Sequence, residues 1–312
     1  MDNRSNFRTI LQQGNRDPEN KGVIAANFIL LANREVLFYK KHVKIYRVRD
    51  ASHQIRMATS DDEKNFFGLH GDISFEELKI TNERIEVTGL LAPIEPRTIY
   101  AIGLNYRKHA EETGAKIPEY PIVFLKSPTA VQDPDGPIVL PRHLRSDQVD
   151  FEAELGVIIG CKCRNVSAAD ALNYVLGYTV ANDVSARDWQ KTWGGSQWCR
   201  GKTFDTFCPI GPALVTQDSV KNPDNLAIST RVNGVTMQQS NTGDMIFSVS
   251  KIIEFLSGST TLEPDTLIIT GTPEGVGMGR NPPVYLKAGD RVEVEIEGIG
   301  ILRNSVIEEK IA

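Results

Sequence analysis

The amino-acid sequence predicts a β-rich α+β fold built around a large mixed sheet that curls on itself. Segments with the apolar pattern of strands outnumber segments with the pattern of helices. The clearest strand is Asp290–Gly298, where polar and apolar residues alternate with period two. Such alternation is expected where one face of a sheet is buried.

Two prolines, Pro93 and Pro96, punctuate the chain and indicate a linker. We therefore expect a small N-terminal domain at residues 1–92 and a larger domain at residues 93–312. Within the first domain the patterns indicate an apolar run at Ile24–Leu31, strands at Glu35–Val48 and Arg84–Gly89, and a polar loop at Ser60–Gly71.

The pattern is clearer after Pro96. Met245–Leu256 repeats apolar residues at helical spacing, and Ser167 suits the N-cap of a helix that runs to Leu176. A further helical turn is expected at Asn105–Thr113, and a proline-rich loop at Pro128–Pro141. The expected strands are Thr98–Gly103, Ile122–Leu125, Phe151–Gly160, Gly177–Asn182, Leu226–Val232, Thr266–Gly271 and Arg291–Ile296.

The composition excludes several classes of protein. The chain has 312 residues and a formal net charge of −5, so it lacks the basic character of a nucleic-acid-binding protein. No apolar stretch approaches the ~20 residues of a membrane span. Acidic residues at Asp2, Asp17 and Glu19, without an apolar core, argue against a secretory signal and a mitochondrial presequence. We therefore expect a cytoplasmic protein with neither nucleic acid nor membrane as partner.

Two carboxylates, Glu152 and Glu154, stand two positions apart in an expected strand, so their side chains point the same way. A third acid, Asp183, follows the next core strand. Adjacent carboxylates repel each other unless a cation joins them, and oxygen ligands suit Mg²⁺ or Mn²⁺. The alternative is a solvent-facing strand edge with unpaired acids, which the spacing of Glu152 and Glu154 alone would favour.

The sequence resembles the fumarylacetoacetate hydrolase superfamily, in particular its shorter, domain-2-like members. The resemblance extends from about Pro93 to about Ile307. It implies a β-roll of mixed sheets with a small N-terminal domain, and a homodimer. The motifs that carry it, in this order, are Ile102–Tyr106, Asp150–Glu154, Asn182–Arg187, Gly201–Phe207 and Thr270–Gly277.

The resemblance also implies roles for individual residues. Glu152, Glu154 and Asp183 would bind the metal. His109 and Glu112 would form a general-base dyad on a mobile lid, since residues three apart on a helix are neighbours. The alternative for that pair is a surface ion pair. The residues expected to hold the carboxylate and oxo groups of the substrate are Arg187, Gln190, Lys202 and Thr272.

Three of these residues have structural alternatives. Arg187 could simply pair with Asp188, Lys202 could be an ordinary loop lysine, and Thr272 could belong to a tight turn alone. Asp205 is expected to be structural.

Together these features predict a Mg²⁺-dependent enzyme, with Mn²⁺ or Ca²⁺ as alternatives, that acts on a small 2-oxo or 1,3-dioxo acid through a metal-bound enolate. We rank C–C bond cleavage first, as acylpyruvate-type hydrolysis or oxaloacetate-type decarboxylation, because the His109–Glu112 dyad could activate water. The second hypothesis is an oxaloacetate keto–enol tautomerase. The third is a catalytically silent metal-binding scaffold.

Overall fold

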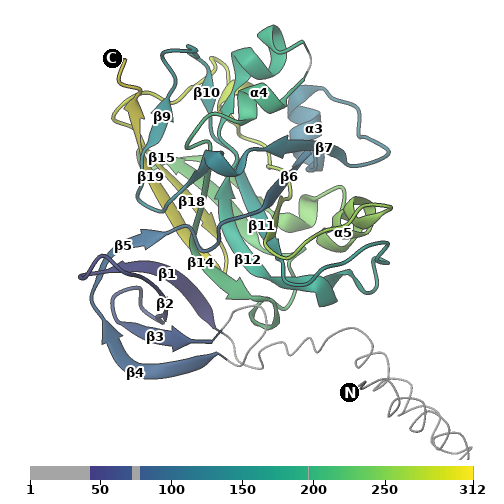
Figure 1. Cartoon of the computed structure of the whole chain (residues 1–312). Helices are drawn as coiled ribbons and strands as arrows, with labels where there is room; N and C mark the ends of the chain where they lie inside the picture. Colours follow the sequence, from purple (N-terminus) through teal and green to yellow (C-terminus); the bar gives the residue numbers. More distant parts are fainter. Residues whose placement is uncertain (1–42, 72–77, 196, 312) are drawn as a thin grey trace, which may run out of the picture. The chain divides into compact units, whose positions relative to one another are not determined.

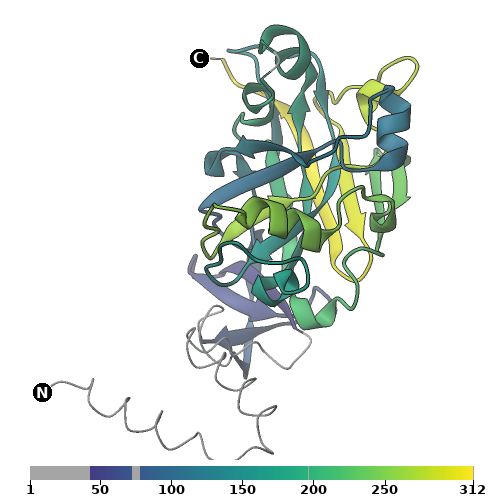
Figure 2. The ribbon, with the colours of Figure 1, turned by 90° about the vertical axis from the view of Figure 1, so that its right-hand side faces the viewer.

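The computed structural model describes residues 43–71, 78–195 and 197–311 (Figures 1 and 2). These residues lie within one compact unit, Tyr39–Ala312. The expected apolar run Ile24–Leu31 and the first part of the expected strand Glu35–Val48 fall outside the described residues.

A twelve-stranded sheet forms the largest part of the described structure. Its central order is β4-β3-β2-β1-β14-β12-β11-β17-β6-β7, while β5 pairs with β1 and β8 pairs with β14. Most neighbours are antiparallel, but β6 and β17 run parallel, as do β8 and β14. The strands are β1 (Lys44–Asp50), β2 (Ile55–Thr59), β3 (Phe66–His70), β4 (Lys79–Ile85), β5 (Val87–Leu91), β6 (Thr98–Gly103), β7 (Ile122–Lys126), β8 (Val131–Gln132), β11 (Ala153–Ile159), β12 (Val175–Asn182), β14 (Cys208–Thr216) and β17 (Thr266–Ile269).

A five-stranded sheet packs against the large one, in the order β16-β15-β18-β19-β9. Its strands are β9 (Ile138–Leu140), β15 (Ala227–Val232), β16 (Val235–Asn241), β18 (Arg291–Ile296) and β19 (Gly300–Glu308), and a separate two-stranded sheet joins β10 (Val149–Asp150) to β13 (Ser185–Ala186). The helical segments are α3 (Arg107–Thr113), η1 (Pro128–Ala130), η2 (Ala171–Tyr174), η3 (Asp188–Trp193), α4 (Cys199–Lys202), η4 (Gln217–Ser219), η5 (Thr242–Asp244), α5 (Val249–Ser257) and η6 (Gly277–Gly279).

The main core lies between the two large sheets and helix α5. It includes Leu155 and Val180 from the twelve-stranded sheet, Val294 from the five-stranded sheet, and Ile252 and Ile253 from α5. Because β11 and β12 are buried on both faces, their sequences read as nearly continuous apolar runs. Of the acids that the sequence singles out, Glu154 lies on β11, Glu152 directly precedes β11, and Asp183 directly follows β12.

The mixed sheets confirm the predicted fold class. The helix near Met245–Leu256 is present as α5, and Ser248 caps it by accepting a hydrogen bond from the backbone N–H of Lys251. The expected helix from Ser167 to Leu176 is wrong. Only the short segment η2 forms there, because the side chain of Ser167 bonds to the Asp170 carboxylate instead of capping a helix.

Other differences concern strands that the sequence pattern does not reveal. Part of the expected loop Ser60–Gly71 forms β3, and the expected loop Pro128–Pro141 contains β8 and β9. The strands β14, β16 and β19 are also absent from the sequence-based expectation. Of these three strands, β14 pairs with β12 and with β1, which is far away in the chain, whereas β16 and β19 form hairpins with the expected strands β15 and β18.

The strands before Pro93 share the large sheet, because β1 pairs with β14 and with β5. In Figures 1 and 2, β1–β4 lie at the opposite end of this unit from α3 and α4. A boundary between a small N-terminal domain and a catalytic domain near residue 92 remains a prediction. Among the described residues, no helix is long and apolar enough to cross a bilayer.

Gly177 allows close contact between β12 and β14, since a Cβ atom there would lie 2.3 Å from the backbone oxygen of Val215. We expect Gly177→Ala to lower the unfolding free energy by about 1–3 kcal/mol through steric strain. Gly89→Ala on β5 is the matched control, because nothing lies within 4 Å of its added Cβ. Urea denaturation measures the unfolding free energy of both variants. Equal stability of the two would contradict the packing argument.

Candidate active site

A cavity of about 210 Å³ opens between β6, β7, the start of β11, η3, α4 and the loop after β17. Every expected site residue except Glu112 and Asp183 lines it directly. No described residue before Ile102 lines it. The lining residues are Ile102, Gly103, Leu104, His109, Thr113, Ala115, Ile122, Phe124, Glu152, Glu154, Arg187, Gln190, Lys191, Trp198, Lys202, Thr272 and Met278.

The three acids expected from the sequence converge at one end of the β11–β12 pair. One carboxylate oxygen from each of Glu152, Glu154 and Asp183 lies within 4.8 Å of the other two, and all three side chains are buried. Strand register places Glu154 opposite Ala181. The backbone N–H of Asp183 also donates to the carbonyl of Glu152 at 2.9 Å, which joins the segments on either side.

Two buried lysines hold these carboxylates in place. Lys202 Nζ donates to Glu152 Oε2 and to Asp183 Oδ2, both at 2.7 Å. Burial alone would lower the pKa of Lys202, but Asp183 and Glu152 raise it above its ordinary value, so the amine stays protonated. Lys126 Nζ donates to Asp183 Oδ1 at 2.6 Å and to the backbone oxygen of Lys202. Asp183 therefore lies between two ammonium groups.

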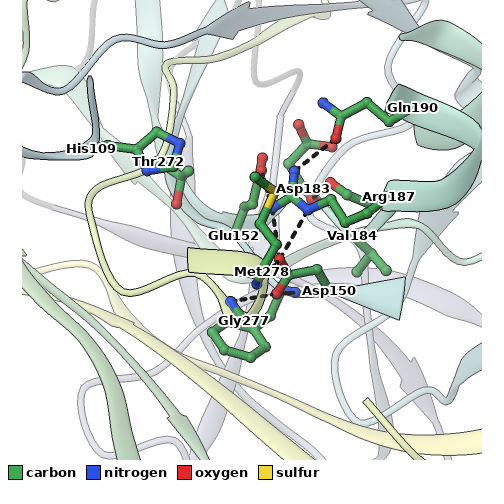
Figure 3. Close-up of polar contacts among 12 residues, drawn as sticks. His109, Asp150, Glu152, Asp183, Val184, Arg187, Gln190, Thr272, Gly277 and Met278 are labelled. Carbon is green, nitrogen blue, oxygen red and sulfur yellow. Dashed lines mark hydrogen bonds and ion pairs between the residues drawn. The ribbon is translucent and has the colours of Figure 1, made fainter. Parts of the chain in front are cut away.

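A fourth buried acid, Asp150, orients Arg187. Its carboxylate accepts from Arg187 Nε at 2.9 Å and from the backbone N–H groups of Gly277 and Met278 at 2.8 and 3.0 Å (Figure 3). The same guanidinium lies 2.7 Å from Glu152 Oε1. Burial would lower the pKa of Arg187, but the adjacent carboxylates of Glu152 and Asp150 raise it, so it stays charged.

Glu154 lacks a comparable cation. Its Oε2 accepts from the backbone N–H of Gly271 at 2.7 Å, and burial together with repulsion from Asp183 and Glu152 raises its pKa well above the ordinary range. Glu152 differs, because Lys202 and Arg187 overcome the effect of burial and lower its pKa. The cluster thus has room for additional positive charge beside Glu154.

The donor set fits a hard divalent cation. Ligand oxygens on an octahedral Mg²⁺ ion lie about 3 Å apart when adjacent and about 4.2 Å apart when opposite, given Mg–O distances of about 2.1 Å. The oxygens of the three acids are already close to this spacing. Four buried acids (with Asp150) and three buried cations, Lys126, Arg187 and Lys202, leave a formal charge of −1 when all are ionised. A divalent cation and an anionic substrate would balance it.

His109 and Glu112 form a hydrogen bond at the other side of the cavity. His109 Nδ1 lies 3.0 Å from Glu112 Oε2, and His109 is nearly buried on α3. The backbone N–H of Gly275 donates to Glu112 Oε1 at 2.9 Å. Burial alone would raise the pKa of Glu112, but these two hydrogen bonds lower it below its ordinary value. Glu112 therefore stays ionised. An ionised carboxylate on Nδ1 leaves Nε2 of His109 free to exchange a proton.

Gln190 and Thr272 contribute polar groups near the cluster, and Figure 3 shows His109 and Thr272 on the opposite side of Glu152 from Gln190. Gln190 Oε1 accepts from Arg187 Nη1 at 2.9 Å, which fixes the orientation of its amide. Thr272 Oγ1 accepts from Gln238 Nε2 at 2.8 Å. Both side chains are buried and held by neighbours.

The structure shows the contacts of several residues for which alternatives were left open. Arg187 pairs with Asp150 and Glu152. Asp188 instead accepts from the Ser146 hydroxyl. Lys202 is 1% exposed and therefore is not an ordinary loop lysine. The His109–Glu112 pair lies at a cavity and not on an open surface.

Sequence reasoning misses three residues of this network. Lys126 ends the outer strand β7, where a lysine is ordinarily solvated. Gln238 lies on β16 of the other sheet, and its Oε1 accepts from the backbone N–H of Ala153. Asp150 belongs to a motif quoted above, so its position was a usable signal, but nothing in the spacing indicated its bonds to Gly277 and Met278.

Comparison with known proteins identifies the family. The family described as "Fumarylacetoacetate (FAA) hydrolase C-terminal" matches residues 98–307. The chain belongs to the fumarylacetoacetate hydrolase family. Members of this family are metal-dependent enzymes, and the chain is therefore an enzyme with the acidic cluster expected of one.

Similar proteins support the same assignment. Oxaloacetate tautomerase FAHD2A, mitochondrial, of Bos taurus is 49% identical over 224 residues, which cover 72% of this chain and 71% of the relative. A solved structure of 2-hydroxyhepta-2,4-diene-1,7-dioate isomerase from Mycobacterium marinum matches with a TM-score of 0.73 and 36% identity over 86% of this chain and 100% of the other. A fumarylacetoacetate hydrolase from Exiguobacterium antarcticum matches with a TM-score of 0.75 and 35% identity over the same shares.

The expectation of a cytoplasmic protein is contradicted by these comparisons. Similar members of the fumarylacetoacetate hydrolase family from Bos taurus, Rattus norvegicus and Homo sapiens are named as mitochondrial. The acids near the start of the chain, on which the expectation depended, are therefore a poor guide to its location. The homodimer remains a prediction.

We expect Glu154→Ala to abolish binding of Mg²⁺ or Mn²⁺, because it removes the acid without a cationic partner among the described residues. His109→Ala should leave metal binding unchanged, since His109 offers no oxygen ligand. Isothermal titration calorimetry measures both affinities. Wild-type affinity in Glu154→Ala would exclude the proposed metal site.

We expect Lys126→Met to lower the unfolding free energy by roughly 3–5 kcal/mol, because it leaves a buried Asp183 oxygen without its donor. Lys162→Met is the matched control, as Lys162 pairs with Glu263 on the surface and should change stability by less than about 1 kcal/mol. Urea unfolding, monitored by tryptophan fluorescence, compares the unfolding free energies of the two variants. A loss below about 1 kcal/mol for Lys126→Met would show that its contacts are not structural.

Proposed function

We propose that this enzyme interconverts the keto and enol forms of oxaloacetate or a closely similar 2-oxo acid. The observation that carries the proposal is the buried cluster of Glu152, Glu154, Asp183 and Lys202, which shares one cavity with His109. Relatives named oxaloacetate tautomerase and a structural neighbour named as the isomerase of a dicarboxylate support this choice. Both names describe isomerisation without bond cleavage.

Glu152, Glu154 and Asp183 are the residues that would hold the divalent cation. When bound, the cation would act as a Lewis acid on the carboxylate and 2-oxo oxygens of the substrate. Mg²⁺ is the metal that we propose, on the basis of the all-oxygen ligand set.

Lys202 and the polar groups of the cavity would stabilise the charge on the substrate. The protonated Lys202 amine lies where it can donate to an oxygen that gains negative charge as the enolate forms. Gln190 and Thr272 would donate to the substrate carboxylate. Arg187 would contribute positive charge and orient Gln190, because its own donors already contact Asp150, Glu152 and Gln190.

His109 would move the proton. With Nδ1–H donating to Glu112, Nε2 accepts a proton from C3 of the keto form, and a proton from solvent completes the enol at the C2 oxygen. Nε2 then releases its proton to solvent, which restores neutral His109. In the reverse direction Nε2 returns the proton to C3 while the enol oxygen loses its own. Atoms and charge balance in both directions, and no water is consumed.

C–C bond cleavage is the second candidate function. The same His109–Glu112 pair that exchanges a proton with C3 could activate water for acylpyruvate hydrolysis. Decarboxylation of oxaloacetate would need only the charge stabilisation at the acid cluster. The products distinguish these reactions from tautomerisation.

We expect Mg²⁺-dependent loss of enol-oxaloacetate absorbance in the ultraviolet, without formation of pyruvate. His109→Gln should lower kcat by about 10²–10⁴-fold, the range for loss of a general base. Metal affinity of this variant, measured by calorimetry, should equal that of the wild type.

A coupled lactate dehydrogenase assay detects pyruvate, which tautomerisation does not produce. Pyruvate together with CO₂ from oxaloacetate would identify a decarboxylase, and pyruvate with an acid product from acylpyruvates would identify a hydrolase. If either reaction forms pyruvate faster than the enol is lost, that reaction would replace tautomerisation as the proposed function.

A further inference from the structure

Three cationic side chains line the cavity: Arg187, Lys191 and Lys202. Two of them are committed to protein carboxylates. Arg187 contacts Asp150 and Glu152, and Lys202 contacts Glu152 and Asp183. Each is nearly fully buried by these contacts. Neither can turn toward a distant part of a substrate without breaking buried ion pairs, which is costly.

Lys191 differs from both. It follows Gln190 on η3 at the rim of the cavity and retains an exposed side chain. Within the described part of the chain, no carboxylate forms an ion pair with it. Partial burial and repulsion from Arg187 lower the pKa of Lys191 below its ordinary value, and a bound anion would offset both effects. The cavity thus has a cation to which the described residues supply no carboxylate partner.

Ile122, Phe124 and Trp198 form an apolar part of the lining, and Phe124 packs edge-on against Trp198 with ring centroids 5.6 Å apart. Gly103 allows this packing, because a Cβ atom there would lie 2.2 Å from the Trp198 ring. The amine of Lys202 lies 5.1 Å from the centre of the Phe124 ring but already donates to Glu152 and Asp183. A second carboxylate directed at these apolar side chains would therefore lose its hydration without gaining an uncommitted cation.

We propose that Lys191 binds the distal carboxylate of the substrate and thereby makes the enzyme selective for dicarboxylic 2-oxo acids over monocarboxylic ones. The inference rests on the proposed function, in which the 2-oxo acid end of the substrate lies at the acid cluster. The substrate then spans the cavity, with one end at Gln190 and Thr272 and its other carboxylate at the rim. Lys191 is a specificity-determining residue in this arrangement, and it takes no part in proton transfer.

Steady-state kinetics of Lys191→Met tests the proposal with two substrates, oxaloacetate and phenylpyruvate, which enolises but has no distal carboxylate. We expect kcat/KM for oxaloacetate to fall about 10-fold or more, chiefly through KM, as for loss of one charged hydrogen bond. The kcat/KM of Lys191→Met for phenylpyruvate should equal that of the wild type. Lys191→Arg should restore most of the oxaloacetate activity, and Lys162→Met, which removes a surface charge outside the cavity, should match the wild type.

An equal loss with both substrates, or no loss with oxaloacetate, would overturn the proposal. A binding measurement separates it from the proposed function. In calorimetry with Mg²⁺, Lys191→Met should weaken binding of 3,3-difluorooxaloacetate, which cannot enolise, but not of oxalate, which has no distal carboxylate. If this difference appears while the wild type shows no tautomerase activity, the proposed function fails and the role of Lys191 stands. If both ligands bind as they do to the wild type, the role of Lys191 is refuted.

Discussion

The structure of this site depends on the pairing of charges that are buried together. Asp150, Glu152 and Asp183 lie in the interior, and each contacts Arg187 or a buried lysine. A single unpaired charge at such a depth would be strongly unfavourable, so removal of one partner affects the whole network. Glu154 is the exception, since its pKa is raised and its partner among the described residues is a backbone N–H group. This imbalance is the physical basis for proposing a cation there.

The same acids also fix the loop that follows β17. Glu154, Glu112 and Asp150 accept hydrogen bonds from backbone N–H groups of Gly271, Gly275 and Gly277 respectively. Three elements, the strand β11, the helix α3 and the segment before β11, thus hold one loop. Thr272 lies within this loop and so has a fixed position relative to both His109 and the acid cluster. A movement of α3 would break the Glu112 contact, because Glu112 is the acid of the three that lies on α3.

The chemistry of the family is compatible with several outcomes at one site. Charge stabilisation at an enolate oxygen is common to tautomerisation, decarboxylation and hydrolysis, and the Lys202 environment supports it in each case. What differs is the fate of the proton and the access of water. In our proposal, substrate selection depends on Lys191, the cation of the cavity lining that is not paired with a carboxylate of the described residues.

The sequence by itself determined the family, the β-rich mixed fold and the acids of the cluster. The acids could be recognised because Glu152 and Glu154 stand two positions apart at the start of an expected strand, where side-chain direction follows from spacing. Only the tertiary structure decided which cations meet these acids. Lys126, Lys202 and Arg187 come from β7, α4 and the end of β13, and their meeting depends on sheet register and on loop paths that no local pattern encodes. The short strands β8 and β9 escaped detection for the same reason, since a strand of two or three residues is defined by its partner and not by its own sequence.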